Sequence, residues 1–285
     1  MGEFVLIGDR GGFRRYRRWR VAMTAFLGIA IVSGLCSGCD DRSDRSNLTA
    51  SQGEPTVSYD VEQQIPLQEV IQEVSRVEIE TQQGGITVRG VDQEPITATA
   101  QIRVWAYSEK DAQRLAEQVK LHVKRTGDTL RIHPTIPPGR TGCRFEVTVD
   151  VPIPRQLLSG AAAQNSDRSL KVQSETGSVK VDNIEGTVIA KTSTGSIELN
   201  EVSGPVRLET CTGSITVRNA MGGVTAKTTT GSITINSAKS HVTAETSTGT
   251  AVVEVNADQW DGNIVSASSC TGTGRVVIGS LTRKP

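Results

Sequence analysis

The chain has 285 residues with 31 basic and 31 acidic side chains, and aromatic residues make up only 4% of it. This length allows one or two domains with a buried core. The first 39 residues contain six arginines and two acids, leaving 25 basic against 29 acidic residues elsewhere. No basic stripe remains to contact phosphates, which argues against nucleic acid as a partner.

Residues 1–39 have the layout of an export signal. Five arginines between positions 14 and 20 directly precede the apolar run "VAMTAFLGIAIVSGL", which is short for a membrane span. The following "LCSGCDD" resembles the bacterial lipobox, and the resemblance implies lipidation of Cys39. Cys36 stands where an aliphatic residue is usual, so an ordinary cleaved signal and an uncleaved signal anchor are the alternatives. We expect an exported lipoprotein of the cell envelope, on the periplasmic side of a membrane or at the cell surface.

Residues 40–72 are polar and contain "DRSDRSNLTASQGEPT", which has no periodicity. Such a composition does not supply a core. We therefore expect a tether between the membrane and the folded part of the chain.

Residues 73–157 predict a β-rich region with one short helix. Alternating apolar and polar residues predict strands at 75–81, 85–89 and 96–106. Ser108 and Asp111 resemble a capping box, followed by the apolar face of Ala112, Leu115 and Ala116. The segment "FEVTVDVPIP" adds a strand. We expect these strands to begin the sheet of the C-terminal part and to cover its edge.

A hairpin is predicted about Gly127-Asp128 in "VKLHVKRTGDTLRIHP". Its pairing sets His122 opposite His133, about 5 Å apart on the outer face. Two imidazoles could hold a transition metal, but no third ligand is evident. We therefore expect no metal or other cofactor and retain His122 and His133 only as a minor candidate pair.

Residues 158–285 contain a repeat of eighteen residues. Thr-Gly recurs at 176, 194, 212, 230 and 248, and a fixed period takes precedence over local propensity. Two pairs of apolar columns alternate with polar residues in each repeat, which predicts two short strands joined by glycine corners. An aliphatic residue does not recur at every sixth position, as left-handed hexapeptide helices require. The prediction is an all-β fold, a right-handed β-solenoid with two short strands per 18-residue coil.

Polar columns of the repeat suggest how its coils are aligned. Lys191, Glu209, Lys227 and Glu245 alternate in sign down one column, and Lys180 and Glu198 do so in another. Neighbours one coil apart should form ion pairs that specify register.

Threonines also form columns at one corner, which makes a candidate ligand-facing ladder of hydroxyls: Thr192, Thr194, Thr210, Thr212, Thr228, Thr230, Thr246 and Thr248. Such a ladder could hydrogen-bond a carbohydrate. The alternative is that threonine simply favours strands and corners.

Three cysteines follow the signal: Cys143, Cys211 and Cys270. Cys211 and Cys270 both precede Thr-Gly and should occupy one column about three coils, or roughly 14 Å, apart. A disulfide requires Cα atoms within about 7 Å, so we expect no bridge between them. Whether Cys143 forms a disulfide is open.

Three stretches, "VEIETQQGGITVRG", "VTVDVPIP" and the serial "TGSIEL…VSGPVRLETCTGSITV", resemble the bacterial β-solenoid family known as "putative adhesins", a domain of unknown function. The resemblance covers about residues 74–279. It implies an envelope-associated or surface-exposed solenoid and brings no catalytic residues with it.

Catalysis is not expected from this sequence. Polysaccharide lyases also use β-helices, but they need clustered carboxylates, and here the acids fall in different columns. We expect a non-catalytic, adhesin-like binding or scaffolding module anchored to the membrane, with an envelope glycan or protein as partner. The alternative is a structural or stress-sensing envelope protein that assembles with a membrane partner, and a polysaccharide-active enzyme ranks third.

Overall fold

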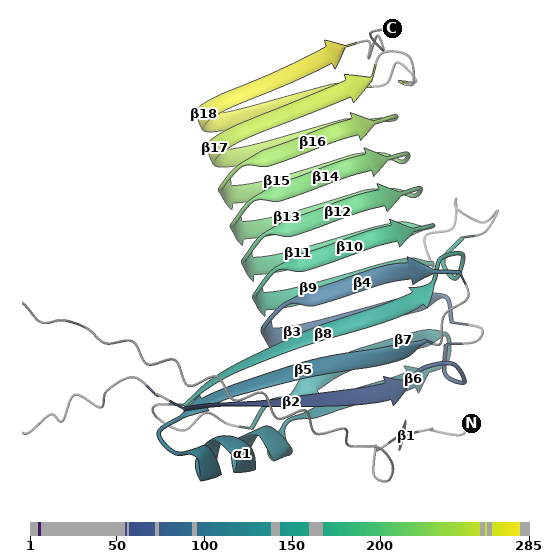
Figure 1. Ribbon diagram of the computed structural model, residues 1–285. Coiled ribbons are helices and arrows are strands. Elements are labelled where there is room, and N and C mark those ends of the chain that lie inside the picture. The colour runs from purple at the N-terminus through teal and green to yellow at the C-terminus, as the bar shows by residue number, and fades with distance from the viewer. Residues whose placement is uncertain are drawn as a thin grey trace, which may run out of the picture.

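The computed structural model describes residues 5–6, 55, 57–71, 74–92, 96–137, 143–159, 168–256, 260 and 264–279. Its strands form one 18-stranded, mostly parallel sheet, and one short helix accompanies them. Figure 1 shows two parts, a regular stack of strands and a broader group of strands and helix at one end of it. The expected all-β class with one helix is confirmed. The predicted signal, including Cys39, lies outside the described residues apart from positions 5 and 6.

The broader part, here called the base, consists of β2, β5, β6, β7, β8 and α1. β5 (Thr97–Ala106) lies between β2 (Val57–Pro66) and β8 (Arg144–Pro154) and pairs antiparallel with both. β6 (Lys120–Thr126) and β7 (Thr129–Thr135) form the expected hairpin, and the two-residue β1 (Val5–Leu6) pairs with β6.

Strand β2 corrects the predicted extent of the tether. Residues 57–66 were expected within the polar segment 40–72, but all ten pair with β5. Of the apolar residues in this segment, only Ile65 and Leu67 are buried, whereas Val57, Tyr59 and Val61 are half-buried. The polar Gln63 takes an inward position, where its amide donates to the carbonyl of Val119, the C-cap of α1, and accepts from the N–H of Leu121 in β6. This inward polar residue interrupts the alternation by which a strand is recognised in the sequence.

Helix α1 (Glu109–Gln118) forms where its cap predicted it. The Ser108 hydroxyl accepts a hydrogen bond from the Asp111 amide at 3.2 Å, which satisfies one of the otherwise unpaired N–H groups of the first turn. Ala112, Leu115 and Ala116 are buried. The helix packs through this face against β2 and β5.

The regular part, here called the coil stack, contains two files of parallel strands. One file holds β4 (Ile86–Val91), β10 (Val179–Ile184), β12 (Ile197–Val202), β14 (Ile215–Ala220) and β16 (Ile233–Ala238). The other holds β3 (Arg76–Gln83), β9 (Ser169–Thr176), β11 (Thr187–Thr194), β13 (Val206–Thr212) and β15 (Val224–Thr230). Two long strands, β17 (Val242–Asn256) and β18 (Val265–Gly279), continue both files.

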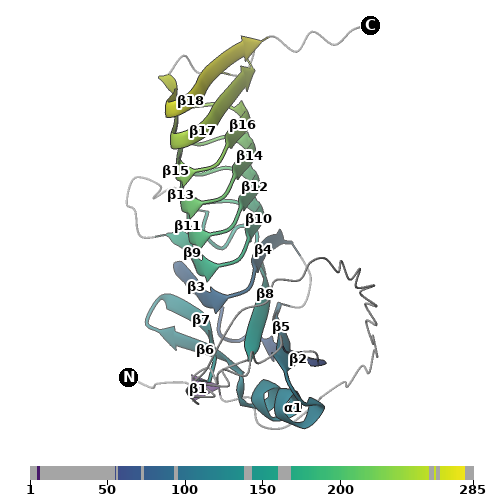
Figure 2. The same ribbon diagram turned by 90° about the vertical axis from the view of Figure 1, so that its left-hand side faces the viewer.

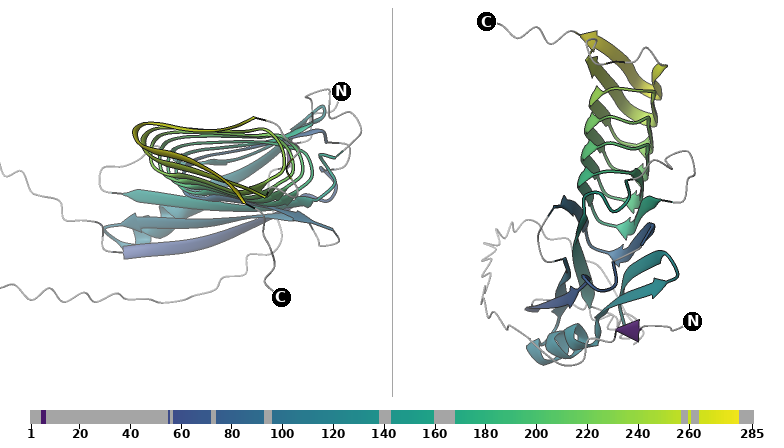
Figure 3. Two further views of the ribbon diagram at one scale, coloured as in Figure 1. Left: turned by 90° about the horizontal axis from the view of Figure 1, so that it is seen from above. Right: turned by 90° about the vertical axis from the view of Figure 1, so that its right-hand side faces the viewer.

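The register of these files follows the sequence repeat. Val179 pairs with Ile197, Ile197 with Ile215, and Ile215 with Ile233, each step being eighteen residues. Seen from above, successive coils superimpose (Figure 3). β3 and β4 supply the first coil although they lie far from β9 in the chain, because Val77 pairs with Leu170. The expectation that N-terminal strands begin the same sheet is confirmed.

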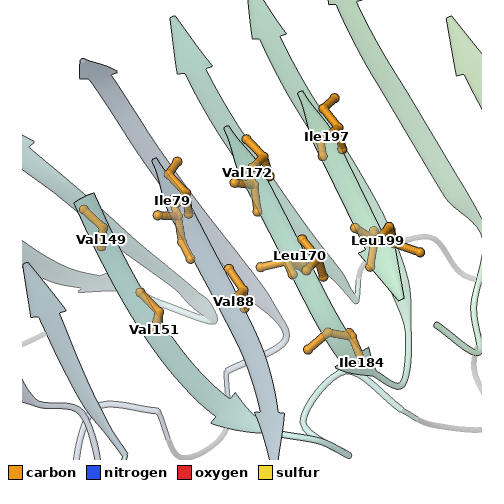
Figure 4. Close-up of a cluster of buried hydrophobic side chains, with 14 of the residues drawn as sticks. Ile79, Val88, Val149, Val151, Leu170, Val172, Ile184, Ile197 and Leu199 are labelled. Atoms are coloured by element: carbon orange, nitrogen blue, oxygen red, sulfur yellow. The ribbon is translucent and has the colours of Figure 1, made fainter. Parts of the chain in front are cut away.

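Apolar columns fill the space between the two files. Val172 and Leu170 face Ile197 and Leu199 in the interior, alongside Ile79 and Val88 of the first coil (Figure 4). Each fully buried aliphatic side chain contributes about 1.5–3 kcal/mol. One continuous core reaches from Ile65 in the base to Val255 in β17, so the stability of each coil depends on its neighbours.

Corner glycines allow the coils to stack closely. Gly195 has φ +147°, and a Cβ there would overlap the carbonyl of Gly177 in the preceding coil. Gly213 repeats this arrangement on Gly195. Only glycine fits a corner that combines this backbone angle with so close a neighbour.

Candidate functional site

A shallow trough of about 790 Å³ runs along the coil stack across β9, β11, β13, β15, β17 and β18. Three parallel columns form it, with three lining residues from each of β9 to β17 and two from β18. The first column is mostly charged, the second supplies the floor, and the third carries small polar side chains and thiols apart from Glu175 on β9. The strands that line it are stacked one above another on the same side in Figure 2. A ligand lying in the trough would therefore meet polar side chains in a similar arrangement at each step along the stack.

The charged wall is the column Lys191, Glu209, Lys227 and Glu245. Lys191 lies 2.7 Å from Glu209, and Lys227 lies 2.7 Å from Glu245, which confirms the expected ion pairs. Hydrogen bonds from Lys191 and then from Arg207 lower the pKa of Glu209. The carboxylates along this wall therefore have lysine partners from adjacent strands.

The second predicted ion pair is wrong. Lys180 and Glu198 are register partners on β10 and β12, but Lys180 lies 3.6 Å from Asp182 of its own strand, whereas Glu198 pairs with Arg218 at 2.6 Å. Arg218 stands one coil further on and diagonally displaced from Glu198. Its long guanidinium side chain reaches that carboxylate with a charge-assisted hydrogen bond.

The floor is the column of threonines Thr192, Thr210, Thr228 and Thr246. Each is 4–6% exposed, and each hydroxyl donates to the carbonyl of a corner glycine, Gly177, Gly195, Gly213 or Gly231, at 3.1–3.2 Å. Strand alternation turns these side chains inward immediately after the charged column. All four still line the trough, but their hydroxyls already hold the corner, so their contact with a ligand stays a prediction.

The opposite wall consists of the exposed column Ser193, Cys211, Thr229, Ser247 and Cys270. Beyond it lies the exposed corner column Thr194, Thr212, Thr230 and Thr248. This second threonine column stays a candidate for ligand contact. The sequence analysis did not identify the column from Ser193 to Cys270 as a candidate site, although this column is the variable second position of the recurring "T-[SCT]-T-G" corner.

The three cysteines of the described region are free. Cys143 is half-buried, while Cys211 and Cys270 are exposed and face the trough. The register carries the Cys211 column through Thr229 and Ser247 to Cys270, so the two thiols stand three strand steps apart, as the repeat predicts.

The charged column continues from the trough into the base. Lys191 pairs with Gln173, and Gln173 pairs with Glu80 of β3. The register that pairs Ile79 with Ile132 then brings Glu80 beside His133 of β7. A single outward row thus extends from the trough to the hairpin.

His122 and His133 are paired across the hairpin as predicted, and their rings stack with centroids 5.4 Å apart. Burial, followed by repulsion from His122, lowers the pKa of His133. Within the described ranges, no group of three or more His, Cys, Asp or Glu side chains could hold a metal ion. The two imidazoles stay a minor candidate pair for a transition metal.

The described part of the chain contains no helix that is long and apolar enough to cross a membrane. The predicted lipid attachment at Cys39 falls outside the described residues. It stays a prediction from the sequence.

No family model matches the chain, and no curated protein matches it in sequence. Among solved structures, it is similar to a "putative cell adhesion protein" from Clostridium sporogenes (13% identity, TM-score 0.38, covering 78% of this chain and 97% of that chain). It is also similar to a "putative adhesin" from Bacteroides fragilis (12%, 0.38, 79% and 96%) and to a "putative lipid binding protein" from Parabacteroides distasonis (10%, 0.26, 77% and 96%). At these identities and TM-scores, the likeness carries no argument about function, which must come from the trough itself.

Proposed function

We propose that this protein is an exported, lipid-anchored component of the cell envelope whose coil stack is a right-handed β-solenoid serving as a non-catalytic, adhesin-like binding module. The observation that carries this proposal is the trough, which repeats one set of polar groups from β9 to β18. A surface that is periodic along one direction suits a ligand that is itself a linear, repeating chain.

The chemistry of the trough favours an envelope glycan as this ligand. The exposed hydroxyls of Thr229 and Ser247 stand about one strand spacing, roughly 4.8 Å, apart, and Ser193 stands two spacings from Thr229 because Cys211 lies between them. Hydroxyls both donate and accept hydrogen bonds, as sugar hydroxyls do. Because Glu209 and Glu245 already have lysine partners, the wall offers little net charge and favours a largely neutral polymer.

The same pairing argues for binding rather than catalysis. Glycoside hydrolysis uses two carboxyl groups placed on either side of one bond. Along the trough, Glu209 and Glu245 alternate with Lys191 and Lys227 in one column, and both carboxylates have lysine partners. The opposite wall carries hydroxyls, thiols and one acid, Glu175 at its β9 end, two strands away from Glu209.

The position of the tether suits presentation of the trough away from a membrane. A chain cleaved before Cys39 would lack β1 and would enter the fold at β2 in the base, at the end of the molecule opposite β18 (Figure 1). An anchor on Cys39 would leave the seventeen residues 40–56 before β2, which span at most about 55 Å when extended. The stack would then project outward from the membrane surface.

The binding proposal is tested by filling the trough. Thr229→Trp places a large ring in the middle of the exposed wall, whereas Thr216→Trp places the same ring on β14, on the other file of the stack. Binding of both variants to a panel of envelope polysaccharides is measured by calorimetry. We expect Thr229→Trp to weaken binding by about tenfold or more and Thr216→Trp to have little effect. Equal binding by the two variants, or no glycan bound by the unaltered protein, contradicts the proposal.

The placement is tested separately by labelling. Radiolabelled palmitate should enter the unaltered protein and should not enter Cys39→Ala. Incorporation into both proteins, or into neither, contradicts lipidation at Cys39 while leaving the glycan measurement to decide the role of the trough.

A further inference from the structure

Among the described residues, no strand covers the outer side of the last coil of the stack. β18 pairs with β17 along its length, and no other described strand pairs with it. Val276 and Ile278 are 39% and 52% exposed, although Val253 and Val255, their partners in the coil below, are 0% and 2% exposed. The apolar columns that reach Val276 and Ile278 therefore end at exposed side chains, whereas Val265 and Ala267 of the same strand are half-buried against the core. Beside them runs a fifteen-residue strand edge that no other described strand pairs.

The opposite end of the stack differs in two ways. The first coil is followed by β7 and β8, and β8 is covered in turn by β5 and β2, with α1 packed on β2 and β5. β2, the outermost of these strands, carries Asp60, Glu62 and the terminal Pro66, and charges and proline protect an edge from pairing. β18 carries a single charged residue, Arg275, in fifteen.

We propose that two copies of this chain join through β18 about a two-fold axis, so that the sheet continues antiparallel from one copy into the other. The apolar columns that end at Val276 and Ile278 would meet the same columns of the second copy. Because the base covers the other end of the stack, head-to-tail growth into a filament has no second surface to use. A two-fold pair uses the same surface twice and closes.

Charge complementarity supports a second copy as the occupant and selects a register. Val277 pairs with Glu254 of β17. If Val276 lies on the two-fold axis, Arg275 stands opposite Val277 of the second copy. Glu254 of the second copy pairs with that Val277, so it lies one strand beyond it on the same outward face of the sheet. The two backbones are then about 10 Å apart, a distance that extended arginine and glutamate side chains span together.

This contact would form twice by symmetry. Arg275 and Glu254 make no ion pair with any described residue of their own chain. Both are exposed, so both are available to a second copy.

The size of the open end fits a reversible dimer. Each half of β18 is about seven residues, or roughly 23 Å, long, and the two facing sheets are about 10 Å apart, with side chains extending further. The end therefore offers roughly 500 Å² per copy, or about 1,000 Å² in total, which is the lower bound for a specific interface. Backbone hydrogen bonds along β18 would contribute further binding free energy. We therefore expect a dissociation constant in the micromolar range.

The first test measures the mass of the full chain in mild detergent by light scattering at micromolar concentrations. We expect a dimer for the unaltered protein and a monomer for Val276→Lys, which sets two like charges together at the axis. Thr216→Lys adds the same charge in the middle of the stack and should stay dimeric. A monomer for the unaltered protein, or an open-ended series of larger species, overturns the proposal.

The second test does not depend on whether Val276→Lys keeps β18 folded. Arg275→Glu and Glu254→Arg should each weaken dimerisation by about tenfold, because attraction becomes repulsion at two symmetric contacts, and the double variant should recover most of it. Failure of the double variant to recover overturns the register. Hydrogen exchange gives a further check: protection of β18 amides should rise with protein concentration, and protection independent of concentration would show that the protein's own chain covers this edge.

Discussion

In the coil stack the strands from β9 to β17 pair with strands eighteen residues away, whereas in the base the pairings are all different. β2 pairs with β5 across the span from Val57 to Ala106, and β5 pairs with β8 across the span from Trp105 to Arg144. Both parts share one apolar core. The contrast teaches that the stack derives its stability from repeated equivalent contacts, so it should tolerate changes that preserve the period and fail on changes that break it.

The largest expected effect comes from altering that period. Deleting residues 198–215 removes eighteen residues and joins Ile197 to Thr216 in phase, so the chain should fold with one coil fewer. Deleting residues 198–214 removes seventeen, which turns Thr216 inward and Ile215 outward and should unfold the stack beyond that point. Circular dichroism and thermal unfolding distinguish the two. Equal stability of both deletions would contradict a structure organised by the repeat.

A smaller but still large effect is expected at the corner glycines. In Gly213→Val the new side chain would overlap the backbone of Gly195 at φ +147°, and we expect a loss of more than about 4 kcal/mol in the free energy of unfolding. The matched change in the base is Gly127→Ala, where φ is +61° and nothing lies within 4 Å. It should cost only about 1 kcal/mol. Denaturant unfolding measures both, and similar losses would argue against close packing of the corners.

The two threonine columns allow a finer comparison within the stack. Thr228→Val removes the hydroxyl that bonds the Gly213 carbonyl, and we expect a loss of about 1–2 kcal/mol. Thr230→Val, two residues on in the exposed column, should change the stability by less than about 0.5 kcal/mol. The same two variants should have the opposite ranking for ligand binding. If Thr228→Val is neutral for stability, the floor hydroxyls do not hold the corners.

These columns also show what the sequence could and could not predict. The period, the two strands per repeat, the helix cap and the hairpin all follow from local patterns and were found where expected, because each rests on residue spacing alone. The inward orientation of Thr192 also follows from spacing, since it continues the alternation of Val188 and Ala190, although its hydroxyl first suggested an outward role. The partner of Glu198 depends on the reach of Arg218, and β2 carries its inward amide at Gln63, which are contacts between distant parts of the chain.

The smallest expected effect is a pH dependence of the free energy of unfolding that arises in the base and not in the coil stack. Burial and the neighbouring His122 lower the pKa of His133 below its ordinary value, so the unfolded chain binds a proton more readily than the folded one. The free energy of unfolding should therefore be fully retained above the ordinary histidine pKa and should fall as the pH drops below about 6.5. His133→Gln should reduce this dependence, whereas His241→Gln, at an exposed position of the stack, should leave it unchanged. Hydrogen exchange as a function of pH should then show the hairpin of β6 and β7 opening before the stack, and uniform opening of both parts would contradict a local origin of the effect.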